Sequence, residues 1–501
     1  MSALASLKER IAECKRLTEA LSVVHWDMET YMPPGGAESR AEQLAVLQRL
    51  AHTLFTSDEV GNLLEASLAE TSDLPYDHDD AAHLRVIKRT YDREVKVPSD
   101  LVAEEAKTTA LAHEEWKKAR KQNDYKLFQP WLEKIVDIER KITEHRGYKE
   151  TLYDGMLDVF EPGMTTAEVE RIFTQFREGL VELVKQIRES GVEVDNSVMF
   201  RKYDVEKQKL VTNDVVGRIG FDFNHGRQDI AVHPFCTSFS SLDVRITTRF
   251  DENYLPGSVF ASMHEAGHAM YEQGFPREFL GTMLADGASL GFHESQSRMW
   301  ENQVGRSREF ISYYLPELKK FFPESLSDVE VEQFYRAANK VQPSLIRVEA
   351  DEVTYNLHIM LRFEIEKAMV AGTMNFSELP EIWNSKMEEY LGIRPDKDAN
   401  GVLQDVHWSG GTIGYFPTYS LGNLIAAQLW EKAESEMPDL RRNIAQGEFQ
   451  PLLGWLRKNV HAHGSKYLPS ELVQKITGSP IDANVCLKYL RAKYSEIYNL
   501  D

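Results

Sequence analysis

Two histidines and a glutamate in the stretch SMHEAGHAMYEQG, residues 262–274, have the types and spacing of a hydrolytic metal site. His264 and His268 are four positions apart, so on a helix both imidazoles lie on one face and can reach the same metal ion. Glu265 follows His264 directly, which places its carboxylate beside that face, as suits a base that acts on water. The pattern favours a zinc hydrolase, and a buried pair of structural histidines is the alternative.

The flanking residues predict that this motif lies inside a helix. Pro256 and Gly257 interrupt the preceding segment, Ser258 can cap the helix, and Gly274 followed by Pro276 ends it. An apolar side is provided at helical spacing by Val259, Phe260, Met263 and Met270.

A catalytic zinc site needs a third protein ligand, and Glu294 in the stretch GFHESQSRMWEN is the best candidate. Glycines at 281, 287 and 291 allow the chain to reverse and to begin a second helix beside the first. His293 is a rival ligand, but adjacent helix positions point about 100° apart, so only one of the two can face the metal. We therefore expect Glu294 at the metal and His293 beside a ligand or at the substrate.

Helical patterns run through most of the chain, and no Ser/Gly-rich or Pro-rich linker divides its 501 residues. This predicts a mainly α fold with one large helical body and a cleft, as a single peptidase domain over residues 1–501. Within it, we expect residues 1–150 to form a helical region that covers the cleft and residues 151–501 to form the catalytic region.

The charge balance excludes some classes of partner. The chain has 58 basic and 79 acidic residues and a net charge of −21, which argues against binding nucleic acid or an anionic membrane through a basic face. Cys14, Cys236 and Cys486 are widely separated and form no CxxC pair, as is typical of free thiols in a reducing compartment. No apolar run of about 18 residues and no signal peptide are evident, so we expect a cytoplasmic protein.

The clearest strand signal lies just before the motif helix. Apolar and polar residues alternate in two runs, 230–232 and 244–246, with serines at 240–241 between them, which predicts a short β-hairpin. An edge strand next to an active site can bind an extended peptide through backbone hydrogen bonds. His233 and Arg245 would then be placed to approach a substrate.

Two later stretches carry further candidates. In the helical pattern of residues 327–372, Arg347 and Asp351 lie one turn apart, and an ordinary helix salt bridge is the simplest interpretation. Residues 401–424 are rich in glycine and aromatic residues, a composition typical of loops that form the wall of a site. That loop contains three candidate site residues: His407, Tyr415 and Tyr419.

Together these segments resemble the carboxypeptidase Taq family of zinc metallocarboxypeptidases, in the order of that family's motifs. The motifs are HPF at 233–235, DVRITTR at 243–249, HEAGH at 264–268, HESQ at 293–296, IRVEAD at 346–351 and GVLQDVHW at 401–408. The segments WDMETYMPPG and YFPTYSLGN are also similar, so the resemblance covers nearly the whole chain.

The resemblance implies an almost entirely helical fold like that of neurolysin and angiotensin-converting enzyme, with a deep cleft and a homodimeric assembly. It also implies one zinc ion per subunit bound by His264, His268 and Glu294, with Glu265 as general base and acid. Cobalt or manganese could replace zinc at such a ligand set.

The same resemblance implies roles at the substrate. Arg347 would grip the terminal carboxylate of the peptide, and His407 with one tyrosine would act at the reacting carbonyl. Analogy with related helical peptidases favours Tyr419 over Tyr415. On sequence grounds alone, Arg245 and Arg249 are rivals of Arg347, because an arginine holds a carboxylate through two parallel hydrogen bonds.

We therefore expect a zinc carboxypeptidase that acts on peptides with a free carboxy terminus and releases single terminal amino acids with broad specificity. One alternative is an oligopeptidase or endopeptidase on the same scaffold, which would not require a free carboxylate. Another is a non-catalytic helical peptide-binding protein with a structural metal. Glu265 counts against the latter, since a structural site has no need of that base.

Overall fold

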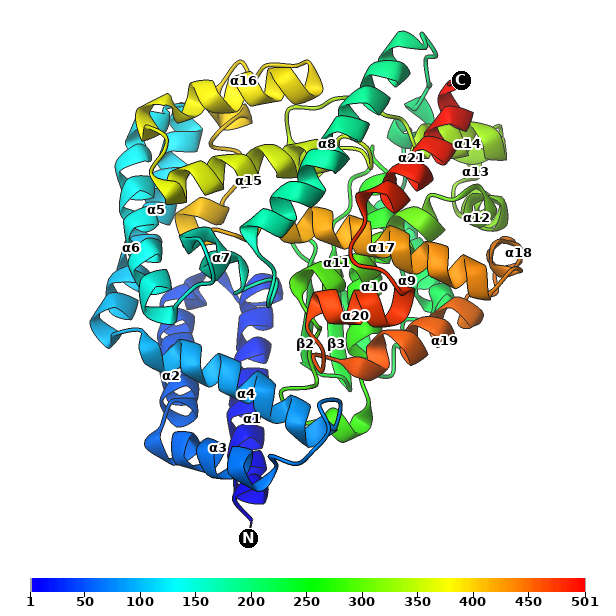
Figure 1. Cartoon of the computed structure of the whole chain (residues 1–501). Helices are drawn as coiled ribbons and strands as arrows, with labels where there is room; N and C mark the ends of the chain where they lie inside the picture. Colours follow the sequence, from blue (N-terminus) through cyan, green and yellow to red (C-terminus); the bar gives the residue numbers. More distant parts are fainter. Residues whose placement is uncertain (1, 501) are drawn as a thin grey trace. The chain divides into compact units, whose positions relative to one another are not determined.

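The computed structural model describes residues 2–500, which divide into two compact units. Unit 1 contains the residues up to 94 together with 195–338 and 429–478, and unit 2 contains 95–194, 339–428 and the residues from 479 onward. Figure 1 shows that helices predominate and that strands are confined to one small sheet. The predicted mainly α fold is therefore confirmed, whereas the organisation as one peptidase domain stays a prediction.

Unit 1 carries the sheet and the helix with the histidine motif. Its elements are α1 (Ala3–Thr30), α2 (Ala37–Phe55), α3 (Asp58–Glu70), most of α4 (Asp79–Lys96), α9 (Val205–Ile219), β1 (Gly226–Ile230), β2 (Cys236–Ser240), β3 (Asp243–Thr248), α10 (Pro256–Glu272), α11 (Leu290–Arg298), α12 (Arg308–Phe321), α13 (Pro323–Leu326), α14 (Val331–Ala338), the end of α17 (Pro417–Glu436), α18 (Leu440–Ala445), α19 (Gln450–Asn459) and α20 (Pro469–Thr477).

The regular secondary structure of unit 2 is helical in its described residues. Its elements are α5 (Ser99–Gln122), α6 (Gln129–Arg146), α7 (Leu152–Leu157), α8 (Thr166–Glu189), α15 (Tyr355–Ala371), α16 (Leu379–Leu391), the first part of α17 and α21 (Ala483–Tyr498). In the described part of the chain, no helix combines the length and the apolar character needed to cross a membrane.

The sheet has three strands in the order β1-β3-β2. A hairpin with its turn at residues 240–243 is present, but its strands are β2 and β3. The run 230–232 was predicted to be its first strand, whereas β1, which ends at Ile230, pairs with β3 in parallel. The apolar side chains of this run lie at the surface, since Ile230 is 52% exposed and Val232 is 79% exposed. Gly226 allows the parallel pairing, because a Cβ atom there would lie 2.1 Å from the carbonyl oxygen of Val244.

The motif helix α10 packs against β3, α9 and α11. It begins at Pro256, before the predicted cap at Ser258, and the four predicted apolar residues are buried. Ser258 does not cap the helix, contrary to expectation. Its side chain is buried inside the first turn, where the hydroxyl donates to Gln208 Oε1 at 2.7 Å.

The second helix of the site, α11, is capped by Ser289, whose hydroxyl accepts a hydrogen bond from the amide of Phe292. Gly281 adopts a φ of +74° in the preceding connection, which fits the predicted chain reversal. A π-helical segment, Met299–Gly305, follows α11 directly and also packs against α10.

Candidate active site

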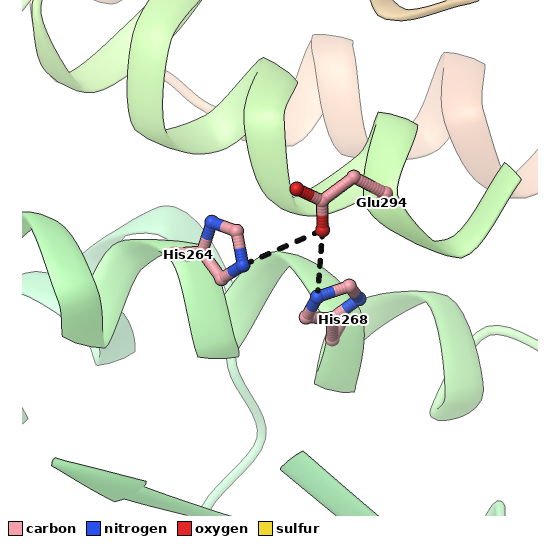
Figure 2. Close-up of side chains that lie close together, drawn as sticks. All are labelled: His264, His268 and Glu294. Atoms are coloured by element: carbon pink, nitrogen blue, oxygen red, sulfur yellow. Dashed lines mark ion pairs between the residues drawn. The ribbon is translucent and has the colours of Figure 1, made fainter. Parts of the chain in front are cut away.

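His264, His268 and Glu294 form one group whose possible ligand atoms all lie within 4.8 Å of one another. Glu294 Oε2 is 3.6 Å from His264 Nε2 and 3.4 Å from His268 Nε2, and Figure 2 shows it between the two rings. In a tetrahedral zinc site with bonds of about 2.1 Å, neighbouring donor atoms are about 3.4 Å apart. The separations from Glu294 to both histidines therefore match those of a single cation of this kind.

The close contact between α10 and α11 depends on Gly267, which lies between the two motif histidines. A Cβ atom at this position would lie 2.6 Å from Ser297 Cα and 2.7 Å from the carbonyl oxygen of Gln296. Both atoms belong to the backbone of α11, so the helix cannot yield by a side-chain rotation. The absence of a side chain at Gly267 thus allows α11 to approach α10 closely enough for Glu294 to reach the two histidines.

Gly267→Ala should destabilise the protein by about 1–3 kcal/mol and weaken metal binding, because the two helices must move apart. Urea unfolding of the metal-free protein and a zinc titration would measure the two effects. Gly454→Ala is the matched control, since Gly454 is also helical and a Cβ atom there would meet nothing within 4 Å. Equal stability and zinc affinity in both variants would contradict this explanation.

Glu265 is buried, with 7% exposure, on the same helix as the two histidines. Burial raises the pKa of its carboxyl group to about 7, and the adjacent His264 opposes that shift. A carboxyl group with a pKa near neutrality can both accept and donate a proton at the pH of the cell.

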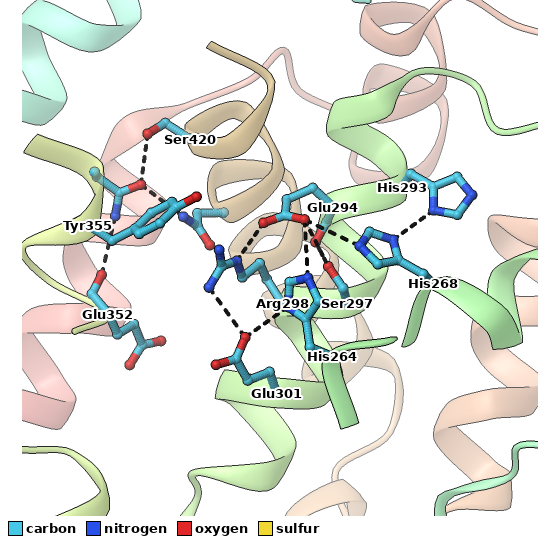
Figure 3. A network of polar contacts seen from close by, with 12 residues as sticks. His264, His268, His293, Glu294, Ser297, Arg298, Glu301, Glu352, Tyr355 and Ser420 are labelled. Carbon is cyan, nitrogen blue, oxygen red and sulfur yellow. Dashed lines mark hydrogen bonds and ion pairs between the residues drawn. The ribbon is translucent and has the colours of Figure 1, made fainter. Parts of the chain in front are cut away.

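Arg298 holds the two carboxylates on either side of it, as Figure 3 shows. Its Nε donates to Glu294 Oε1 at 2.6 Å, while Nη1 donates to Glu301 Oε2 at 3.3 Å. Burial alone would raise the pKa values of both glutamates, but the guanidinium keeps them below the ordinary range. Glu294 therefore presents an ionised Oε2 toward the histidines.

Both motif histidines have an outer hydrogen-bond partner at Nδ1. Glu301 Oε2 lies 2.9 Å from His264 Nδ1, whereas His293 Nδ1 lies 2.7 Å from His268 Nδ1. The structure thus places Glu294 in the group of three donors and His293 against a histidine of that group. Glu301 was not among the predicted site residues, although an acid seven positions after Glu294 in a helical pattern was a usable signal.

The candidate residues near the sheet have different surroundings. His233 is exposed in the connection between β1 and β2. Arg245 on β3 donates two hydrogen bonds of 2.9 Å to Asp243, and its guanidinium lies 4.6 Å from the ring centroid of Trp26. Arg249 is exposed directly after β3. His233 and Arg249 are thus at the surface on either side of the hairpin, whereas Arg245 within it is held by Asp243 and Trp26.

In unit 2, Arg347 is buried, with 5% exposure, and is not paired with Asp351 as the sequence suggested. Its Nε and Nη2 both donate to Asp405 Oδ1, at 3.0 and 2.9 Å, and Nη1 donates to Tyr355 at 3.1 Å. Asp351 instead accepts hydrogen bonds from the amides of residues 342, 353 and 354. A second buried arginine, Arg362, binds the other oxygen of Asp405 at 2.7 Å.

His407, Tyr415 and Tyr419 lie beside this arginine pair in unit 2. The ring centroid of His407 is 5.5 Å from that of Tyr415, and its Nε2 is 3.5 Å from the hydroxyl of Tyr419. The guanidinium of Arg347 lies 5.1 Å from the centroid of Tyr419. Burial lowers the pKa of His407 to about 4, which keeps its imidazole neutral at pH 7.

Comparison with known proteins decides the family. The model of the carboxypeptidase Taq (M32) metallopeptidase family matches residues 6–494. The chain belongs to this family. It is similar to thermostable carboxypeptidase 1 of Thermus thermophilus, with 42% identity over 99% of both chains, and to carboxypeptidase 1 of Bacillus subtilis, with 39% identity over 96% of both. The crystal structure of the M32 carboxypeptidase from Deinococcus radiodurans superimposes with a TM-score of 0.96 and 38% identity over 100% of both chains.

The M32 membership confirms the resemblance based on the motifs and makes this protein a metallocarboxypeptidase. The motif GVLQDVHW contains Asp405, which the sequence analysis quoted but gave no role. Its position two residues before His407 was the available signal.

Asp405→Asn should destabilise this M32 protein by about 3–5 kcal/mol, because it removes the negative charge that compensates two buried arginines. The change is measurable by chemical denaturation. Asp396→Asn provides a control within the same loop, since Asp396 is exposed and only accepts a bond from Asn400. Equal unfolding midpoints and slopes for the two variants would show that the arginines do not depend on this charge.

Proposed function

We propose that the metal of this metallocarboxypeptidase is zinc, one ion per chain, bound by His264 Nε2, His268 Nε2 and Glu294 Oε2. The observation that carries the proposal is the agreement between the donor separations of 3.4 and 3.6 Å and those of a tetrahedral zinc site. Two nitrogens and one oxygen also suit cobalt and manganese, so either could substitute when available.

A zinc ion bound there would act as a Lewis acid and lower the pKa of a water molecule to about 7. Glu265 then accepts the proton of the attacking water on its carboxylate. The same carboxyl group returns the proton to the amine that leaves when the peptide bond breaks. Its pKa of about 7 supports both roles, because neither direction of transfer is strongly uphill at neutral pH.

Release of single terminal residues requires a cation that recognises the free carboxylate, and we assign this role to Arg347. Three of its N–H groups bind Asp405 and Tyr355, which leaves one on each Nη nitrogen for a ligand. Two parallel N–H groups on a fixed guanidinium match the two oxygens of a carboxylate. Arg245 and His233 stay candidates for contact with the rest of the peptide.

His407 and Tyr419 are our candidates for donating hydrogen bonds to the oxyanion that forms at the reacting carbonyl. A neutral imidazole keeps one N–H donor, and the tyrosine hydroxyl supplies another. Each well-aimed donor of this kind contributes a few kcal/mol to the transition state. Tyr415 is the alternative to Tyr419.

One unblocked peptide and its carboxy-terminal amide, each incubated with and without a zinc chelator, test the proposal by mass spectrometry. We expect stepwise loss of single terminal residues from the free acid, no loss from the amide, and no loss with chelator. A panel of peptides that differ in the last residue would measure the breadth of specificity. Internal cleavage of both peptides would assign an oligopeptidase instead, and cleavage of neither would favour a peptide-binding protein.

The homodimer and the cytoplasmic location stay predictions. Sedimentation equilibrium over a range of protein concentrations would decide the first, and fractionation of the producing cell would decide the second.

A further inference from the structure

His268 is connected to a carboxylate through a second histidine. His268 Nδ1 lies 2.7 Å from His293 Nδ1, and His293 Nε2 lies 2.7 Å from Glu272 Oε1. Figure 3 shows His293 on the side of His268 that is turned away from Glu294. His264, in contrast, meets the carboxylate of Glu301 directly at 2.9 Å.

The location of the protons along this connection follows from hydrogen-bond chemistry. A cation in the group of three donors takes the lone pair of His268 Nε2, so the neutral ring carries its proton on Nδ1. That N–H must donate to His293 Nδ1, which therefore has no proton. The proton of His293 is then on Nε2 and is donated to Glu272 Oε1. Each contact has one donor and one acceptor.

The surrounding packing holds the connection in place. Glu272 is the last residue of α10 and is 9% exposed. The ring centroid of Tyr271 lies 5.2 Å from that of His293, and the Tyr271 hydroxyl is tied to the chain just before α11 by the amide of Ala288. The middle ring is thus fixed by residues of both helices that carry the metal donors.

We propose that His293 and Glu272 are positioning residues of the metal site: they fix the tautomer and the orientation of His268. The inference rests on the proposed zinc ligation by His268. Loss of such outer partners typically weakens metal affinity by about 10–100-fold. The proposed contribution lies in binding the ion, so it is measured in variants that stay folded without metal.

Three variants test the two hydrogen bonds of this connection separately. His293→Leu removes both hydrogen bonds and should weaken zinc affinity by about 10–100-fold. His293→Asn offers an oxygen near the position of Nδ1 and should recover part of that loss. Glu272→Gln keeps an acceptor for His293 but removes the charge, so it should have the smallest effect. Glu278→Gln is the control, since Glu278 is exposed in the turn after α10.

Zinc affinity is measured by competition with a chromogenic chelator, and the visible spectrum of the cobalt-substituted protein reports ligand geometry. Thermal melting of each metal-free variant shows whether it is folded. The proposal requires weakened zinc affinity and an altered cobalt spectrum in variants that stay folded without metal. If His293→Leu fails to fold, His293→Asn and Glu272→Gln provide the same readouts.

Folded His293 and Glu272 variants that bind zinc as tightly as the parent, with the same cobalt spectrum, would overturn the inference. His264→Ala is measured in parallel, so that a failure of the positioning role can be distinguished from a failure of the proposed zinc ligands. If His264→Ala also retains zinc, the ligand assignment itself is wrong. If only His264→Ala loses zinc, the ligand assignment is supported and the positioning role of His293 and Glu272 is wrong.

Discussion

Glu265→Gln is expected to reduce kcat by about 10²–10⁴ while the protein keeps its full content of zinc. The amide has nearly the same size and stays at the same buried position, but it cannot accept the proton of the attacking water. Glu265 is not one of the three donors that converge at the metal site, so metal binding should not depend on its charge. Steady-state kinetics and metal analysis of the same preparation measure both quantities.

The control for this substitution is Glu278→Gln, the same chemical change at an exposed position of unit 1. The control should retain both zinc and activity. Full zinc content together with parental kcat in the Glu265→Gln protein would show that another group is the base.

His264→Ala should abolish both activity and stable zinc binding, because only two of the three protein donors are left. The fold should survive, since Glu301 keeps hydrogen bonds of 3.3 Å from Arg298 and 3.1 Å from Arg306 after its histidine partner is removed. Zinc should raise the melting temperature of the parent protein, as any ligand specific for the folded state does, and should leave that of the variant unchanged.

His145→Ala makes the same substitution at an exposed position in the last turn of α6 and should leave activity and zinc binding unchanged. Retention of one equivalent of zinc by the His264→Ala protein after dialysis would exclude His264 as a ligand.

The part of the site that local spacing determines was predictable from the sequence. His264 and His268 face one side of α10 because four residues make about one helical turn. Glu294 could be proposed because a reversing, glycine-containing segment precedes a second helix, α11. The family motifs then extended the prediction to nearly the whole chain, and the family assignment is confirmed.

The partners of buried charges could not be predicted in the same way. Arg347 and Asp351 have helical spacing, but residues 347–349 form only a short 3₁₀ turn, and the carboxylate of Asp351 binds backbone amides. The actual partner, Asp405, is 58 positions further along the chain. Such pairings depend on tertiary packing, which no local periodicity encodes.

The sheet illustrates the same limit. Alternation of apolar residues correctly indicated β3, but only the first residue of the run 230–232 lies in a strand, and β2 was not predicted. Alternation also does not specify which strands pair or in which direction. β1 joins β3 in parallel through a connection that includes β2, and the apolar side chains at 230 and 232 are exposed.

The order in which the chain is synthesised constrains when the metal site can mature. The unit that carries the three donors is assembled from three separate segments, the last of which ends at residue 478 of 501. A nascent chain folds from its amino terminus, so the ribosome must synthesise the chain at least to residue 478 before this unit can close. During that interval the apolar surface of α10 lacks part of its final packing partners. Contacts between such distant segments also slow folding, so the three donors come together only after the late segment 429–478 has been made.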